Sequence, residues 1–180
     1  MIQKRGEDDS MQNKENTYYR LFRDTCKAIN SSLNLTKVLN LIIENLIAAL
    51  NAKACTVFIW DKERSLLEII ASQGLSESYL KKGLVDPDKS ITETLKGTAA
   101  MIYDTRNDPR LEYPDDAKKE GIASILSVPI SVKDQIIGVM RIYTSERRNF
   151  SDDDYEFITG LANRAGMAIN RSRHYTHLIK

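Results

Sequence analysis

The chain has 180 residues, of which 42% are hydrophobic and 28% are charged, and its formal net charge at pH 7 is +1. This length allows one well-buried core with extensions at the ends, and the composition is that of an ordinary globular protein in water. The small net charge gives no overall field for a polyanion, which argues against nucleic acid as a partner.

The N-terminal part of the chain predicts a tail followed by two helices. Residues 1–16 are almost wholly polar and predict a disordered tail. Over residues 17–29 apolar side chains recur at helical spacing, up to the break at Ser31-Ser32. A second amphipathic helix begins near residue 34 or 36 and continues to residue 50, so it must pack on another apolar surface.

A hairpin and short helices are expected next. Residues 55–60 and 66–71 are strand-like and are separated by turn formers, and Gly74 ends the second strand. Residues 75–97 read as short helices, in which Ser90-Ile-Thr-Glu93 has the spacing of a capping box.

The remainder of the chain predicts three more strands and a long helix. A short strand over residues 99–103 runs into the polar loop 104–110, and a short helix then ends at Gly121. Two further strands follow, at residues 124–132 and 136–143. The last helix starts after Phe150 with Asp152, Asp153 and Asp154, where the helix dipole favours acidic residues.

This order of elements predicts an α+β fold. We expect a mainly antiparallel sheet of about five or six strands, with the N- and C-terminal helices packed on one face. The domain would cover residues 17–171, and residues 172–180 would extend the last helix as a signalling linker. No apolar run approaches the roughly 20 residues that cross a bilayer, and the N-terminus lacks a signal-peptide core. We therefore expect a cytoplasmic protein with no membrane partner.

Three segments together resemble the GAF family, a branch of the PAS-like superfold. They are residues 54–61, residues 102–110, and residues 124–130 followed by 137–143, and their order is completed by Phe150-Ser-Asp-Asp-Asp-Tyr155 and the long helix. The likeness extends from about Leu21 to Arg171. It implies a pocket between the sheet and the small helices and loops, where family members hold cyclic nucleotides, haem, bilins, amino acids or other small molecules.

The residues argue against bilin and haem as cofactors. Bilin-binding members of the family attach their chromophore through a cysteine, commonly followed by histidine, in the helix that here reads Asp115-Asp-Ala-Lys-Lys-Glu120 and contains neither. Haem-binding members need an axial ligand in the cavity, usually histidine, and the only histidines here are His174 and His177 near the end of the last helix.

Two further ligand classes are also disfavoured by the resemblance. Cyclic-nucleotide members carry Asn-Lys after the last strand, where this chain has Tyr143-Thr144, and Tyr155 replaces their distal glutamate, although Phe150 and Asp154 match. Free-methionine sulfoxide reductases of this fold use cysteines in the pocket loop, and that loop has none here. The cofactor is therefore left unknown. A cyclic nucleotide is disfavoured because this chain matches only part of the motif that binds it.

The candidate ligand-binding residues are polar side chains expected near that pocket. The loop 104–110 offers carboxylates and a guanidinium to a polar ligand, but turn chemistry explains the same residues, and we favour the latter. Arg141 is either a cation facing the cavity or a sheet arginine with its tip in solvent, and we favour solvent. The full candidate set is Gln73, Tyr103, Asp104, Asp108, Arg110, Ser124 and Arg141.

Catalytic and metal-binding constellations are missing from the sequence. Asp152, Asp153 and Asp154 are explained by helix capping, and Cys26 and Cys55 lack metal spacing and read as buried thiols. No triad, phosphate loop or metallohydrolase motif appears, so we expect no enzymatic activity and no metal site.

We therefore expect a sensory, signal-transducing regulatory module of the kind found in two-component systems. It would bind a small molecule non-covalently, or a partner protein, and signal as a homodimer through its terminal helices to an effector such as a kinase, cyclase or transcription factor. Two alternatives stay open. One is a small-molecule enzyme on this fold, with Cys55 as the only candidate reactive side chain, and the other is a ligand-free interaction or dimerisation domain.

Overall fold

A computed structural model of the chain describes residues 16–27, 29, 34–83 and 85–178, with side chains described as far as residue 173. The predicted tail, apart from its last residue, and the expected Ser31-Ser32 break lie outside the described residues. No helix in the described part of the chain is both long and apolar enough to cross a membrane.

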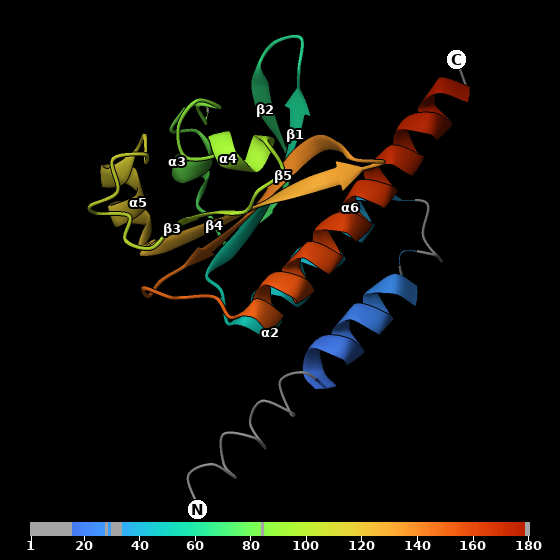
Figure 1. Ribbon diagram of the computed structural model, residues 1–180, viewed down its shortest axis with the longest axis horizontal. Coiled ribbons are helices and arrows are strands. Elements are labelled where there is room, and N and C mark those ends of the chain that lie inside the picture. Colours follow the sequence, from blue (N-terminus) through green and yellow to red (C-terminus); the bar gives the residue numbers. More distant parts are fainter. Residues whose placement is uncertain (1–15, 28, 30–33, 84, 179–180) are drawn as a thin grey trace, which may run out of the picture.

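Three helices form one layer of the molecule (Figure 1). The N-terminal helix covers residues 16–27, α2 spans Leu35–Leu50 and α6 spans Asp152–Leu178. In α2 the buried side chains recur every three or four residues, so one stripe of the helix lies on the sheet. The N-terminal helix packs on α6, where the rings of Tyr18 and Phe157 stack with their centroids 4.2 Å apart.

The sheet has five strands, all antiparallel to their neighbours, in the order β2-β1-β5-β4-β3. This confirms the predicted α+β fold with its mainly antiparallel sheet. Strands β1, β5 and β4 are inner strands, so both of their edges are hydrogen-bonded to neighbouring strands. The strands are β1 Ala54–Asp61, β2 Leu66–Gln73, β3 Ala100–Ile102, β4 Ser124–Val132 and β5 Gln135–Thr144.

Three short helices lie on the other face of the sheet, opposite α2 and α6 (Figure 1). They are α3 Glu77–Leu80, α4 Thr92–Leu95 and α5 Pro114–Glu120. Helix α5 ends as predicted, because Gly121 adopts the left-handed conformation, with φ 72°, that closes a helix. The arrangement confirms that small helices and loops cover the second face.

The predicted capping box at Ser90 is wrong. Helix α4 follows Ile91, which offers no side-chain hydrogen bond to the helix start. Ser90 is buried and its hydroxyl instead donates to the carboxylate of Glu112, with an oxygen–oxygen distance of 3.2 Å. A charged acceptor contributed by a distant loop has displaced the local bond.

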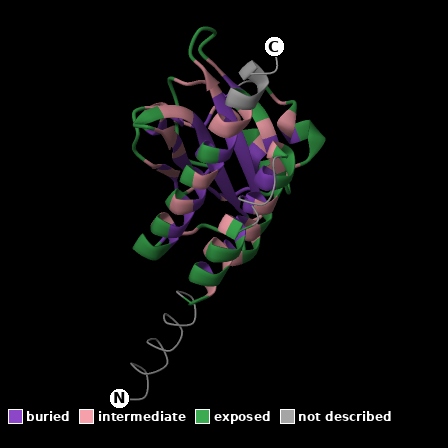
Figure 2. Ribbon diagram, turned by 90° about the vertical axis from the view of Figure 1, so that its right-hand side faces the viewer, coloured by how far each residue is buried: buried purple, intermediate pink, exposed green. Residues whose placement is uncertain are grey.

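The main core lies between the sheet and the helix layer, where Figure 2 shows continuous burial. Cys55 and Val57 of β1 share this core with Met140 and Ile142 of β5. The intervening residues of the same strands point to the opposite face, because successive strand side chains alternate. A smaller apolar cluster there includes Phe58 and Val139.

Asn34 caps α2, and its loss should be measurable. Its side-chain oxygen accepts a hydrogen bond from the backbone N–H of Lys37 at 3.0 Å. We expect Asn34→Ala to lower the free energy of unfolding by about 1 kcal/mol, since the cap satisfies an otherwise orphaned helix donor. Urea unfolding followed by circular dichroism measures this, and Asn34→Ser should keep most of the stability.

Candidate functional site

A pocket of about 260 Å³ opens on the face of the sheet that α3 covers. Thr56 and Phe58 of β1 and Tyr143 of β5 form part of its wall, and Lys82 and Val85 from the segment after α3 close it. The strand residues reach the pocket by alternation, since their neighbours point into the main core. The pocket therefore has an apolar and hydroxyl-bearing wall with one cationic side chain, Lys82, and one carboxylate, Glu68, which is exposed at its rim.

Arg141 lies beside this pocket on β5. Its side chain is only 3% exposed, and its guanidinium carbon is 5.8 Å from the centre of the Tyr143 ring. The expectation that its tip reaches solvent is wrong, because the segment that bears Ser90 packs over this face of the sheet and contacts the guanidinium. Arg141 is a cation held inside the protein, on the same strand face as Tyr143.

The hydrogen bonds of Arg141 are incomplete. Its Nη2 donates to the hydroxyl of Ser90 at 3.4 Å, while its buried Nε has no hydrogen-bond partner in the described structure. Ser90 in turn donates to Glu112, whose carboxylate also accepts from the backbone N–H of Asp86 at 3.0 Å. Among the described residues no carboxylate forms an ion pair with Arg141, so a serine separates this cation from the Glu112 charge.

Lys82 is a second cation in the same place. Its ammonium donates to the backbone carbonyl of Tyr79 at 3.1 Å and lies 3.7 Å from the centre of the Tyr79 ring. Burial, together with the positive charge of Arg141, lowers the pKa of Lys82 to about 8, against the opposing effect of acidic groups headed by Glu112. Two cations are thus close enough to repel each other.

The tyrosine hydroxyls around the pocket stay protonated. Burial raises the pKa of both Tyr79 and Tyr143 above the ordinary value. The two rings meet edge to face, with centroids 6.1 Å apart. Their O–H groups are therefore available as hydrogen-bond donors and acceptors, not as bases.

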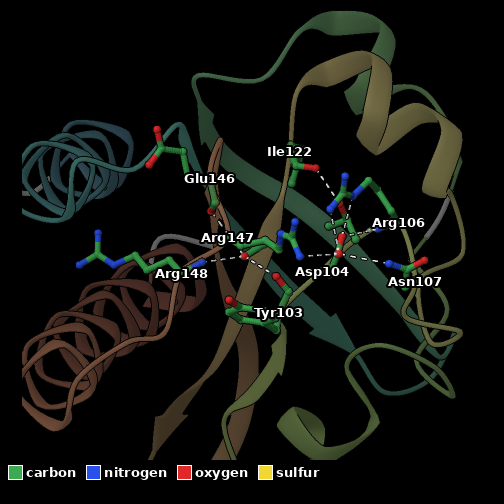
Figure 3. Close-up of polar contacts among 10 residues, drawn as sticks. Tyr103, Asp104, Arg106, Asn107, Ile122, Glu146, Arg147 and Arg148 are labelled. Atoms are coloured by element: carbon green, nitrogen blue, oxygen red, sulfur yellow. Dashed lines mark hydrogen bonds and ion pairs between the residues drawn. The ribbon is translucent and has the colours of Figure 1, made fainter.

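The predicted loop residues form a separate network around Asp104 (Figure 3). The Asp104 carboxylate accepts from Nε and Nη2 of Arg106, both at 3.0 Å, and Arg147 adds an ion pair at 3.4 Å. The Arg106 hydrogen bonds hold the pKa of Asp104 well below its usual range. Tyr103 is 46% exposed beside this network.

Asp108 and Arg110 are likewise satisfied by each other. Nε and Nη2 of Arg110 donate to the Asp108 carboxylate at 3.0 and 2.6 Å, which lowers the pKa of Asp108. Arg110 Nη2 also donates to the backbone carbonyl of Met101, so the pair anchors the loop to β3. This geometry agrees with the turn interpretation of residues 104–110.

The last two candidates lie at strand ends. The Ser124 hydroxyl donates to the carbonyl of Tyr103 at 2.6 Å and accepts from the backbone N–H of Arg148 at 3.1 Å, which joins it to the loop network. Gln73 is exposed at the end of β2, opposite Cys55 in register. Of the seven predicted site residues, only Arg141 lies next to the pocket. It contacts a residue of the wall and does not line the pocket itself.

Several pocket residues were not predicted. Thr56 and Tyr143 were detectable, because alternation places each on the face opposite the apolar core positions of its strand. Lys82 of the wall carried no usable signal, because its segment lacks any regular period. Ser90 and Glu112 do not line the pocket, and their hydrogen bond beside Arg141 joins segments that meet only in the folded chain.

Comparison with known proteins decides the family. The sequence profile of the GAF domain matches residues 34–169, which is most of the chain. The chain belongs to the GAF domain family. The GAF domain of a phosphoenolpyruvate-protein phosphotransferase from Coxiella burnetii superposes with a TM-score of 0.80 at 21% identity, covering 91% of this chain and 98% of that one. This agreement in fold confirms the predicted resemblance.

The curated relatives that this chain matches are much longer proteins. A phosphoenolpyruvate-dependent phosphotransferase system protein of Escherichia coli K12 is 23% identical over 153 residues, which are 84% of this chain and 20% of that protein. A methyl sulfide methyltransferase-associated sensor of Methanosarcina acetivorans is 29% identical over 148 residues, 78% of this chain and 15% of that protein. The chain thus spans about a fifth or less of each relative's length.

Proposed function

We propose that this GAF domain is a regulatory sensory module that binds a small molecule non-covalently and signals through its terminal helices. The observation that carries the proposal is the pocket of about 260 Å³ beside the buried and incompletely bonded Arg141. Such convergent polar groups in an otherwise apolar hollow are typical of ligand sites. The name of the Methanosarcina relative, a sensor, agrees with this proposal.

The contacts of the terminal helices support a role in transmission. Tyr18 donates to the Asp154 carboxylate at 2.6 Å near one end of α6, and Arg171 donates to the carbonyl of Ile29 at 3.0 Å near the other. The N-terminal segment therefore runs parallel to α6 along much of its length. A change in the packing of either helix would displace the other.

A second copy of the chain is the partner that we propose for the outer face of this helix pair. Tyr19 and Met167 are 67% and 56% exposed there, and a groove of about 290 Å³ lies between the helices beside Phe22 and Gly160. Light scattering across micromolar concentrations should give the mass of a dimer, and Tyr19→Glu should shift it to the monomer. A wild-type chain that stays monomeric throughout would contradict the dimer.

Ligand binding is tested by native mass spectrometry of the protein as purified. A retained small molecule, released on denaturation, is the expected result. The competing proposal of a ligand-free interaction domain gains support if the protein carries no adduct and no compound of a metabolite panel, neutral or charged, raises its melting temperature. Effector domains such as kinases, cyclases or transcription factors are the outputs that we propose for the signal.

A non-enzymatic function is part of the proposal, and thiol labelling tests it. Cys55 points into the core under the helices, away from the pocket, and burial raises its pKa to about 12, so it stays a protonated thiol at neutral pH. Cys26 is partly exposed. We expect iodoacetamide to modify Cys26 quickly and Cys55 only on unfolding, as read by peptide mass. Equal rates for both would revive the enzyme alternative.

A further inference from the structure

A buried arginine without a counterion is an unusual feature that calls for a partner. Moving a guanidinium out of water is costly, and proteins normally offset the cost with a carboxylate and full hydrogen bonding. Arg141 has neither among the described residues, since its Nε is unbonded and its one hydrogen bond, to Ser90, is 3.4 Å long. That length is at the outer limit of a hydrogen bond, so an anion can replace Ser90 at little cost.

The unsatisfied groups of Arg141 identify the shape of the missing partner. Nε and Nη2 form one edge of the guanidinium, and the same edge of Arg106 and of Arg110 grips both oxygens of an aspartate in this protein. This side-on, two-bond geometry fits a planar carboxylate, the group that both arginines hold here, and it also fits a phosphate. Arg141 thus presents the edge that two other arginines of the chain fill with a carboxylate.

We propose that the pocket binds a small carboxylate, whose two oxygens meet the Nε and Nη2 edge of Arg141, while Lys82 in the pocket wall supplies a second positive charge. Arg141 does not itself line the pocket but lies against the wall residue Tyr143, so the carboxylate enters beside that ring. This inference rests on the proposed ligand-binding function and names the class of ligand. The apolar wall formed by Phe58, Leu67 and Val85 receives the remainder of the molecule. The volume of about 260 Å³ lies below the roughly 300 to 1,000 Å³ of drug-sized sites, so the ligand is a short-chain acid.

The charge balance around Lys82 makes binding dependent on pH. Lys82 faces Arg141 from β5, Glu112 from the loop before α5, and Asp116 and Glu120 from α5. Glu68 of β2 lines the same pocket, and the rings of Tyr79 and Tyr113 lie under the ammonium. The pKa of Lys82 is about 8. Below that pH the ammonium attracts an anion, and above it the attraction is lost. The affinity for a carboxylate should therefore fall as the pH rises from about 7 to about 9, and Lys82→Met should flatten this dependence.

The test compares matched probes on the full chain. Propionate, butyrate and succinate are titrated by calorimetry and by melting temperature, against propionamide and butyramide as neutral isosteres, at constant ionic strength. Inorganic phosphate tests the other anion that can use the same arginine edge. We expect the carboxylates to bind and to raise the melting temperature, and the amides and phosphate to do neither.

Substitutions at Arg141 assign the effect to the proposed site. Arg141→Lys keeps the charge but loses the two-bond edge, and should weaken binding by about 10- to 100-fold. Arg141→Met should abolish binding, and Arg23→Met, at an exposed position of the N-terminal helix remote from the pocket, should leave it unchanged. Circular dichroism verifies that each variant is folded, and Arg141→Lys serves alone if the methionine variant does not fold.

The outcomes separate this inference from the proposed function. Binding of phosphate or of an amide in preference to carboxylates, or carboxylate binding unaffected by Arg141→Lys, would overturn the inference while the pocket remains a ligand site. Failure of every probe and of the wider metabolite panel would overturn both.

Discussion

Asp154→Asn should lower the free energy of unfolding by about 3 kcal/mol, the largest single loss that we expect. The Asp154 side chain is 3% exposed and pairs with Nη2 of Arg148 at 3.2 Å. It also accepts from the Tyr18 hydroxyl and from the backbone N–H of Ser151. Removing its charge leaves Arg148 without its carboxylate, although Arg148 is 26% exposed, which keeps the cost at the lower end of the range for buried pairs.

The neighbouring aspartates are a matched control for this result. Asp152 and Asp153 occupy the same helix start but are exposed, so Asp153→Asn should change the stability by about 0.5 kcal/mol or less. Urea unfolding of both variants, with fluorescence and circular dichroism as parallel probes, gives the comparison. Equal losses at both positions would mean that the acidic helix start alone accounts for Asp154.

Arg141→Met should have the opposite sign and raise the free energy of unfolding by about 2 kcal/mol. A methionine keeps most of the length of arginine but needs neither hydration nor an anion, and the site lies beside apolar side chains such as Val139. Replacement of buried charges by apolar groups is frequently stabilising by amounts of this order. An arginine retained at the expense of stability is typical of a functional group.

The same experiment distinguishes a binding arginine from a structural one. If Arg141 holds the fold together through Ser90 and Glu112, then Arg141→Met will destabilise the protein, and Glu112→Gln will destabilise it by a similar amount. If Arg141 awaits a ligand, the wild-type protein will gain stability from a carboxylate probe and the methionine variant will not. Melting curves with and without butyrate provide both readings.

Local patterns predicted the fold well because burial here follows regular periods. The helical spacing over residues 34–50 matches α2, whose buried residues are all apolar. Residues 124–132 form the predicted strand, although its first five residues are all buried, including Ser124 and Ser127. The acidic start of α6 was also predicted, and the structure adds that Ser151 and Asp154 cap each other reciprocally. Such contacts join residues a few positions apart, which a sequence displays directly.

The site was harder to predict because its contacts are distant in sequence. Ser90 has capping-box spacing with Glu93, yet it bonds to Glu112, and only the folded chain shows which acceptor prevails. Arg141 was expected to reach solvent because the sequence does not show that the segment bearing Ser90, 51 residues earlier, packs over its face of the sheet. Lys82 lies in a segment of no regular period, so nothing in the sequence marked it.

The alternation of β5 has a mechanical consequence. Arg141 and Tyr143 belong to the pocket side of this strand, while Met140 and Ile142 belong to the core under α2 and α6. The pocket and the helix layer thus share a wall that is one strand thick, and adjacent residues of one backbone touch opposite sides of it. A ligand that draws Arg141 toward itself by a fraction of an ångström would tilt the neighbouring side chains against the helices without any intermediate element.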